Sequence, residues 1–325
     1  MDPLSDVLSL LRPRTYLAGG FDVGGAWAVR FGLHDGVKCY AVVHGACWLA
    51  VEGVAEAVRL KTGDCFILPK GWPFRLASDL SLEPVDALAA LQATGVKGKG
   101  GIARLHGGGC CIVGGYFAFA GNHAEILLGV LPPIVHLQKE SDKTALRWSL
   151  ERMMQELREP QPGGDLVAQQ LAQMILVQAL RLYLTEGAKD GVGWLFALAD
   201  NQMSTAIEAI HNDPAHRWTV EELAQRAGMS RSSFALRFKE TVGESPMEYL
   251  TRWRMLKAGD RLQNSNESIA EIALSLGYES ESAFSTAFKR VMGCSPRQYS
   301  RGCAENSSAQ VRRERVQREA LELAG

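Results

Sequence analysis

The chain has 325 residues, of which 46% are hydrophobic and 22% are charged, and its formal net charge is −1. This length fits two domains better than one, and the composition excludes wholesale disorder and fibrous structure. The near-neutral charge gives no evidence for a nucleic-acid partner. Every apolar run is shorter than the ~18 residues of a membrane span, and the N-terminus does not resemble a secretion signal, so we expect a cytoplasmic protein without a membrane partner.

The first part of the chain has the pattern of short strands. Short runs rich in β-branched and aromatic residues lie at 39–43 and 47–51, and a further apolar run at 65–68 lies between turn residues. Many short strands at such spacing are typical of an antiparallel sandwich or barrel. We therefore predict a β domain over residues 1–135.

The chain contains seven cysteines, an odd number, and no Cys-x-x-Cys pair. This pattern fits neither a disulfide framework nor a zinc site, so reduced thiols are expected. The neighbouring residues Cys110 and Cys111 are candidates for a redox switch, provided that one thiolate is exposed and activated. Burial of both thiols in a strand is the alternative.

A helical pattern replaces the strand pattern in the next part of the chain. Leu146, Leu150 and Met153 recur at intervals of three or four residues, and the stretch 166–184 repeats this spacing. Such spacing predicts two amphipathic helices. We assign residues 136–196 to a helical linker bundle or dimer contact.

An internal repeat marks the part that follows. The stretch 219–249 recurs at 268–299, and aligned residues lie 49 apart up to Gly228 and 50 apart from Phe234 onward. One extra residue between the two helices of the second copy is what two related structural units with one lengthened turn would show. A helical protein–protein module is the alternative, although a solenoid normally needs three or more units.

Each copy predicts two short helices joined by a tight turn. Capping boxes at Thr219 and Ser268 start the first helix, and a glycine ends it. The second helix runs over about 230–242 in one copy and 281–292 in the other. Two helices joined in this way form a helix-turn-helix motif, whose second helix fits the major groove of DNA. A helix over 245–263 is expected to join the two motifs and hold them rigidly.

Residues 197–301 resemble the DNA-binding domain of the AraC/XylS family of bacterial transcription regulators. The motifs that carry the resemblance lie at 269–278, 282–290 and 293–299, from Ile-Ala-Glu-Ile-Ala-Leu-Ser-Leu-Gly-Tyr to Gly-Cys-Ser-Pro-Arg-Gln-Tyr. The resemblance implies a sequence-specific transcription regulator that binds a bipartite site on double-stranded promoter DNA. It also implies RNA polymerase as a partner and a homodimer that doubles the DNA site.

Base contacts are expected from the outer faces of the two second helices, because their phenylalanines point to the core. In related domains the positions of Ser232, Ala235 and Leu236 carry base contacts, and their small or apolar side chains favour contact with a thymine methyl group. The expected base-contact residues are Arg231, Ser232, Ala235, Leu236, Glu281, Ser282, Ser285 and Thr286.

Phosphate contacts are expected from basic side chains in the same region, where they position the protein without specifying sequence. A solvated face is the alternative for each of these side chains taken singly. The expected phosphate-contact residues are Arg237, Lys239, Arg252, Arg254, Lys289 and Arg290.

The N-terminal part resembles a cupin sensor domain of one subgroup of AraC-like regulators. Gly63, Asp64 and Pro69 form the Gly-Asp-x-x-x-x-Pro pattern of cupin barrels. A catalytic cupin needs several histidines and a carboxylate around a metal. Here Phe74 replaces the usual histidine after this motif and Tyr40 stands in the first motif, so we expect no metal, no cofactor and no enzyme activity. The alternative function is a cupin-type metal enzyme fused to a DNA-binding module.

The interior of the barrel is expected to hold a small, partly apolar effector. A filled barrel that serves only in assembly is the alternative. The residues expected to line the effector pocket are Tyr40, Val42, Trp48, Phe66, Trp72 and Phe74.

The predicted fold class is α+β with two domains: a cupin-like antiparallel β-barrel with linker helices, then an all-α tandem helix-turn-helix domain. Residues 302–325, with alternating Arg and Glu, are expected to form a frayed or disordered tail.

Overall fold

The computed structural model describes residues 2–10, 13–34, 36–93, 101–119, 128–137, 144–159, 161–186 and 191–301. The chain divides into two compact units, each of which is described by itself. The β unit takes its described residues from Pro13–Phe119 and Leu131–Glu186. The helical unit takes its described residues from Met1–Arg12, Ala120–Val130 and Gly187–Arg312. The predicted tail, 302–325, lies outside the described residues.

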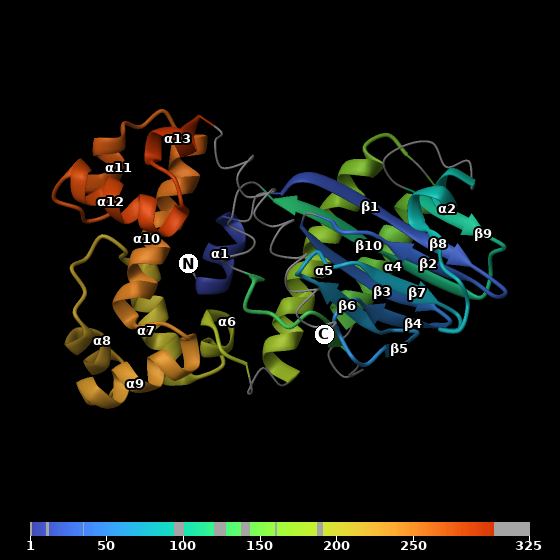
Figure 1. Cartoon of the computed structure of the whole chain (residues 1–325), viewed down its shortest axis with the longest axis horizontal. Helices are drawn as coiled ribbons and strands as arrows, with labels where there is room; N and C mark the ends of the chain where they lie inside the picture. Colours follow the sequence, from blue (N-terminus) through green and yellow to red (C-terminus); the bar gives the residue numbers. More distant parts are fainter. Residues whose placement is uncertain are drawn as a thin grey trace. The chain divides into compact units, whose positions relative to one another are not determined.

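The strands of the β unit form two sheets (Figure 1). The six-stranded sheet has the order β11-β6-β3-β10-β1-β9, and the five-stranded sheet has the order β5-β4-β7-β2-β8. The bounds are β1 (Pro13–Val23), β2 (Ala28–Phe31), β3 (Val37–His44), β4 (Ala46–Val51), β5 (Val58–Lys61), β6 (Cys65–Leu68), β7 (Phe74–Ala77), β8 (Val85–Asp86), the short helix α2 (Ala87–Ala93), β9 (Gly101–Leu105), β10 (Cys110–Phe119) and β11 (Val135–Leu137).

The two sheets face each other across a shared apolar core. Val42, Phe66 and Ile112 of the six-stranded sheet pack in one cluster with Leu49 and Phe74 of the five-stranded sheet. The α+β class with a cupin-like β domain is confirmed, but the sheets are two open mixed sheets rather than a closed antiparallel barrel. One strand pair in each sheet, β1 with β9 and β2 with β8, is parallel.

Two helices cover the outer face of the six-stranded sheet. The helices α4 (Thr144–Arg158) and α5 (Gly164–Glu186) pack on each other, and both contact β3 and β10. Residues such as Ala172 and Leu180 bury the sheet-facing side of α5. These helices, predicted as a linker, therefore belong to the β unit, and the observed division differs from the predicted boundaries at 135 and 196.

The helical unit contains the predicted repeat and one helix from the start of the chain. Its helices are α1 (Pro3–Leu10), α6 (Trp194–Ala197), α7 (Asn201–Asn212), α8 (Val220–Arg226), α9 (Arg231–Val242), α10 (Pro246–Asn264), α11 (Ile269–Ser275), α12 (Glu281–Met292) and α13 (Pro296–Ser300). No helix within the described ranges is long and apolar enough to cross a membrane.

The helix starts follow from local sequence. The four capping boxes at Thr219, Ser245, Ser268 and Ser295 all form, with the hydroxyl accepting from the third residue of the helix and the Glu or Gln side chain accepting from the cap amide. The turns between the paired helices contain glycines with positive φ, 66° at Gly228 and 79° at Gly277. This agreement confirms two helix-turn-helix motifs, formed by α8 with α9 and by α11 with α12.

Helix α1 packs within the helical unit, where it contacts α7 and α10. Its Asp6 carboxylate lies 3.5 Å from Nδ1 of the buried His211. The His211 ring stacks on Trp253 at 3.8 Å, and its Nε2 lies 2.8 Å from the hydroxyl of Tyr249. The sequence analysis placed this segment in the β domain, since nothing in the local pattern links it to residues two hundred positions later.

The buried His211 predicts a pH-dependent stability of the helical unit. Burial lowers the pKa of His211 below its usual 6.5, while Asp6 opposes this shift. The folded state therefore favours the neutral ring, and stability should fall as the pH drops below about 6.5 because the unfolded chain takes up the proton first. Thermal unfolding of the full chain between pH 5 and 8 measures this.

The matched variants for this experiment are His211→Gln and, as an exposed control, His216→Gln. We expect His211→Gln to flatten the fall in melting temperature on the acid side and His216→Gln to leave it intact. An unchanged acid-side fall in His211→Gln would contradict the assignment.

Candidate nucleic-acid interface

The two recognition helices, α9 and α12, are held by equivalent aromatic contacts. Phe234 and Phe238 are fully buried under α9, and Phe284 and Phe288 are fully buried under α12. The ring centroids lie 5.5 Å apart in the first pair and 5.7 Å apart in the second. Since these residues repeat at i and i+4, they fix which side of each helix faces away from the core.

None of the eight predicted base-contact residues is buried. In α9, Arg231, Ser232 and Leu236 are exposed and Ala235 is half-buried. In α12, Glu281, Ser282 and Thr286 are exposed and Ser285 is half-buried, in the same order along the helix. The two helices therefore present matching surfaces of different chemistry.

Two of these side chains, Leu236 and Thr286, offer apolar atoms to a partner. Leu236 is 61% exposed, so its apolar side chain is open to outside contact. The hydroxyl of Thr286 donates to the carbonyl of Ser282, so the methyl group of Thr286 is the part left for an outside contact.

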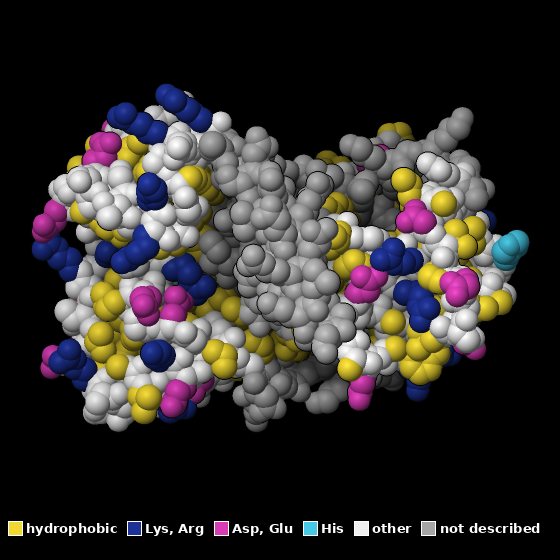
Figure 2. Space-filling model, in the orientation of Figure 1, with side chains coloured by type: hydrophobic (Ala, Val, Ile, Leu, Met, Phe, Trp, Pro, Cys, Tyr) yellow, Lys and Arg dark blue, Asp and Glu magenta, His cyan; other side chains and the backbone are white. Residues whose placement is uncertain are grey.

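The predicted phosphate contacts fall into two groups. Lys239, Lys289 and Arg290 are exposed at the ends of the recognition helices. Arg237 and Arg252 instead form ion pairs inside the helical unit, at 2.5 Å from Asp200 and from Glu244. Figure 2 shows Lys and Arg side chains spread over this face of the helical unit, with acidic side chains between them.

Arg254 has carbonyl partners rather than a free guanidinium. Its Nε donates to the carbonyl of Pro214 at 2.6 Å, and its Nη2 donates to the carbonyl of His216 at 2.9 Å. Burial lowers the pKa of Arg254, although the Tyr278 side chain opposes the shift. The partners of Arg237, Arg252 and Arg254 are not visible in local sequence, and the phosphate contacts expected for these three residues stay predictions.

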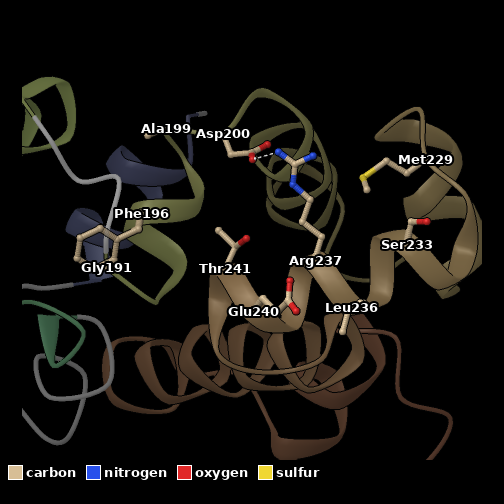
Figure 3. A pocket seen from close by; sticks show the side chains of 10 residues that line it. All are labelled: Gly191, Phe196, Ala199, Asp200, Met229, Ser233, Leu236, Arg237, Glu240 and Thr241. Carbon is tan, nitrogen blue, oxygen red and sulfur yellow. Dashed lines mark hydrogen bonds and ion pairs between the residues drawn. The ribbon is translucent and has the colours of Figure 1, made fainter.

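A groove of about 650 Å³ runs along the flank of α9. Figure 3 shows Arg237 reaching across it to Asp200, with Ser233, Leu236 and Glu240 on the α9 side. Asp200 also accepts from the first backbone amides of α7, so the Arg237 ion pair ties α9 to the start of that helix. Arg237 thus points away from the surface that Ser232 and Leu236 share.

Five of the six predicted effector-pocket residues gather in the core between the sheets. Val42, Phe66 and Phe74 are buried there, and Tyr40 and Trp72 pack against them. Trp48 is the exception. Side chains alternate along β4, so Cys47 and Leu49 enter the core while Trp48 lies on the opposite face under the Arg59 guanidinium.

A cavity of about 230 Å³ lies beside this core. Of the predicted pocket residues, Val42 alone lines it. The other walls come from the turn at Thr62 and Gly63 and from Leu146 and Leu150 of α4. The helices predicted as a linker therefore contribute to the candidate effector site.

Lys38 is an interior residue that the sequence analysis missed. Its ammonium lies 4.6 Å from the ring centre of Phe31 and 4.8 Å from that of Phe74, and the two rings stack at 4.4 Å. Burial lowers the pKa of Lys38 to about 8. Alternation along β3 places Lys38 on the same face as Tyr40 and Val42, which is the signal that would have found it.

The neighbouring thiols of Cys110 and Cys111 are both buried in β10. Cys110 belongs to the core between the sheets, and successive side chains of a strand point to opposite faces, so Cys111 points away from it. A hydrogen bond from Cys47 lowers the pKa of the Cys110 thiol, whereas burial raises that of Cys111. The structure thus shows burial in a strand, and the redox role stays a prediction.

The Gly-Asp-x-x-x-x-Pro motif contributes structure around Asp64. This carboxylate accepts from the amide of Lys61 and lies 3.1 Å from Nε2 of His136. Among the residues that the structure describes, no group of three His, Cys, Asp or Glu side chains comes together as a metal site.

Comparison with known proteins identifies the family. Residues 2–185 match the cupin family model, and residues 223–302 match a helix-turn-helix domain model. An AraC-like transcription regulator of Streptomyces lividans is 44% identical over 301 residues, which cover 92% of this chain and 98% of that protein. The chain belongs to the AraC-like family of transcription regulators.

Another transcription regulator is similar over most of its length. The regulator MtrA of Neisseria gonorrhoeae is 30% identical over 312 residues, covering 90% of this chain and 97% of that protein. Among solved structures, the DNA-binding domain of AdpA in complex with a target DNA covers 34% of this chain and 96% of that chain, with 32% identity and a TM-score of 0.30. The two family models and the similarity to the Streptomyces lividans regulator confirm the AraC/XylS resemblance, and the chain is a DNA-binding transcription regulator with a cupin domain.

Proposed function

We propose that one copy of this AraC-like regulator binds two successive major grooves of promoter DNA, with α9 in one groove and α12 in the next. The observation that carries the proposal is the matching order of buried and exposed residues along the two helices. Successive major grooves on one side of B-DNA lie about 34 Å apart, and a rigid pair of motifs suits that spacing.

Because the outer side chains of α9 and α12 differ in chemistry, the two helices would recognise different bases. Leu236 and Ala235 of α9 favour thymine methyl groups, while Glu281 of α12 favours the amine of cytosine. Arg231, Lys239, Lys289 and Arg290 supply the phosphate contacts in this proposal. Arg237, Arg252 and Arg254 hold the helical unit together instead.

The salt dependence of DNA binding tests this division. Lys239→Ala should lower the slope of log affinity against log salt by about 0.9, since one released counterion is lost. Arg237→Ala, two residues away on α9, should leave the slope unchanged because its guanidinium pairs with Asp200. The measurement is fluorescence anisotropy of the full chain on a duplex selected by the wild-type protein from random DNA.

Equal slope losses in the two variants would contradict the division, and no loss in either would remove Lys239 from the phosphate set. Because the comparison uses slopes, a general loss of affinity in Arg237→Ala does not confuse the result.

The β unit is proposed to sense a small, partly apolar effector. The 230 Å³ cavity beside the core supports this, because it joins the sheet to α4 and has apolar walls. A cupin-type metal enzyme is the weaker alternative, since Phe74 occupies the place of the usual histidine and is buried in the core. Metal analysis of the full chain distinguishes the two.

We also propose that the protein forms a homodimer and contacts RNA polymerase. Its predicted location is the cytoplasm. The outward sides of α4 and α5 carry exposed Trp148, Leu166, Val167 and Met174, which a second copy would cover. Dimer formation would double the number of recognition helices on one promoter.

A further inference from the structure

The two helix-turn-helix motifs share more than the connecting helix α10. Tyr249 and Trp253, near the start of α10, pack beside the first motif, and Met255 and Leu262 belong to the core of the second. If α10 were the sole contact between the two motifs, the motifs could bend relative to each other about that helix. A second contact elsewhere is needed to fix their relative orientation.

The loop before the first motif supplies one side of that second contact. It is bound firmly to its own motif, because the Trp218 indole donates to the carbonyl of Asp213 at 2.8 Å and the Arg226 guanidinium lies over the Trp218 ring at 5.1 Å. Its carbonyls at Pro214, Ala215 and His216 all accept hydrogen bonds from Arg254.

The turn of the second motif supplies the other side. The Arg254 guanidinium lies over the Tyr278 ring, with its central carbon 5.6 Å from the ring centre. A Cβ atom on Gly277 would lie 2.2 Å from the carbonyl oxygen of Ala215 and 3.1 Å from Nη2 of Arg254. The backbone of one motif therefore touches the loop of the other, and only glycine allows this approach.

The equivalent turn in the first motif provides a comparison within the same chain. Gly228 has nearly the same φ as Gly277, 66° against 79°. A Cβ atom on Gly228 would meet nothing within 4 Å. The close approach at Gly277 is thus a property of the contact between motifs and not of the turn itself.

We propose that Arg254, Tyr278 and Gly277 form a joint that fixes the orientation of the two helix-turn-helix motifs, so that both bind their half-sites at once. This inference rests on the proposed two-groove function. Arg254 is a positioning residue here and touches no DNA. Two rigidly linked motifs bind a matched site much more tightly than one motif alone, because the second contact is made at high effective concentration.

The joint predicts a specific pattern of loss. Loosening it should weaken binding to the complete site and leave each half-site contact as it was. It should also reduce discrimination against sites whose half-sites are moved apart, since a flexible pair tolerates wrong spacing. A residue that merely stabilised the fold would weaken all these duplexes alike.

The test uses the full chain and a duplex selected by the wild-type protein from random DNA. Three derived duplexes accompany it: two with one half-site scrambled and one with two extra base pairs between the half-sites. The variants are Arg254→Ala, Arg254→Lys and Gly277→Ala, with Gly228→Ala as the matched control. Affinity comes from fluorescence anisotropy, and thermal unfolding by circular dichroism reports the folded fraction.

We expect Arg254→Ala, Arg254→Lys and Gly277→Ala to lose about tenfold or more on the complete duplex and about twofold or less on the scrambled ones. Their preference for the correct spacing over the lengthened one should fall as well. Gly228→Ala should keep the spacing preference of the wild type. If Gly277→Ala does not fold, Arg254→Lys decides, since it keeps the charge and loses only the planar fork.

Two results would overturn the joint. Equal losses of Arg254→Ala on complete and scrambled duplexes would show a role confined to the fold. Wild-type affinity in Arg254→Lys, with a reduced salt slope in Arg254→Ala, would show a phosphate contact instead. If scrambling a half-site does not weaken binding of the wild-type chain, the two-groove proposal itself fails, and the role of the joint in binding both half-sites fails with it.

Discussion

Replacement of Phe284 by alanine is expected to lower the free energy of unfolding of the helical unit by about 3–5 kcal/mol. Phe284 is fully buried, and its ring packs against Tyr278 at 5.6 Å and Phe288 at 5.7 Å. The substitution removes these contacts and leaves a cavity that neighbouring rings cannot fill. Because domains are stable by only about 5–15 kcal/mol, specific DNA binding should be strongly reduced.

Chemical denaturation of the full chain, followed by circular dichroism at helical wavelengths, measures this effect. Leu274→Ala is the control, because Leu274 is 64% exposed and its loss should change stability by about 0.5 kcal/mol or less. A cost below about 1 kcal/mol for Phe284→Ala would mean that the aromatic core of the second motif is not packed as described.

Replacement of Leu236 by glutamate is expected to weaken specific DNA binding at least about tenfold, or about 1.4 kcal/mol, without loss of stability. Leu236 is 61% exposed on the outer side of α9, so a charge there costs the fold little. Against DNA, the carboxylate would lose water and lie near phosphates of the same sign.

The matched control is Leu274→Glu, which places the same charge on an equally exposed leucine of α11, outside the recognition helices. Anisotropy on the selected duplex at two salt concentrations compares the variants. If both substitutions weaken binding equally, the effect is general repulsion and Leu236 has no place in the groove.

Local signals predicted the helical unit well. Capping boxes at Thr219 and Ser268 and the turn glycines act through backbone groups a few residues away, so the sequence is enough to place helix starts and ends. The i, i+4 phenylalanines likewise determine the outer face of each recognition helix. These signals act within short segments, so the two helix-turn-helix motifs could be predicted from the sequence alone.

Contacts between residues that are distant in sequence could not be predicted. The acceptors of Arg254 at Pro214 and His216 are backbone carbonyls forty positions earlier, which leave no side-chain signature, and its phosphate contact stays a prediction. The parallel pairing of β1 with β9 likewise joins segments that lie far apart in the sequence. Trp48 is a different case. Alternation along β4 places it on the face opposite to Cys47, so the sequence pattern itself was enough to assign Trp48 to the other face of the sheet.

Helix α1 has a consequence for how the protein can be divided. The chain begins in the helical unit, continues through the β unit and returns, so no single cut between residues separates the two units. A fragment that starts at residue 191 would keep both helix-turn-helix motifs but would lack the helix that brings Asp6 to His211. We therefore expect such a fragment to be less stable than one in which α1 is restored, either as a separate peptide or joined to the fragment by a linker.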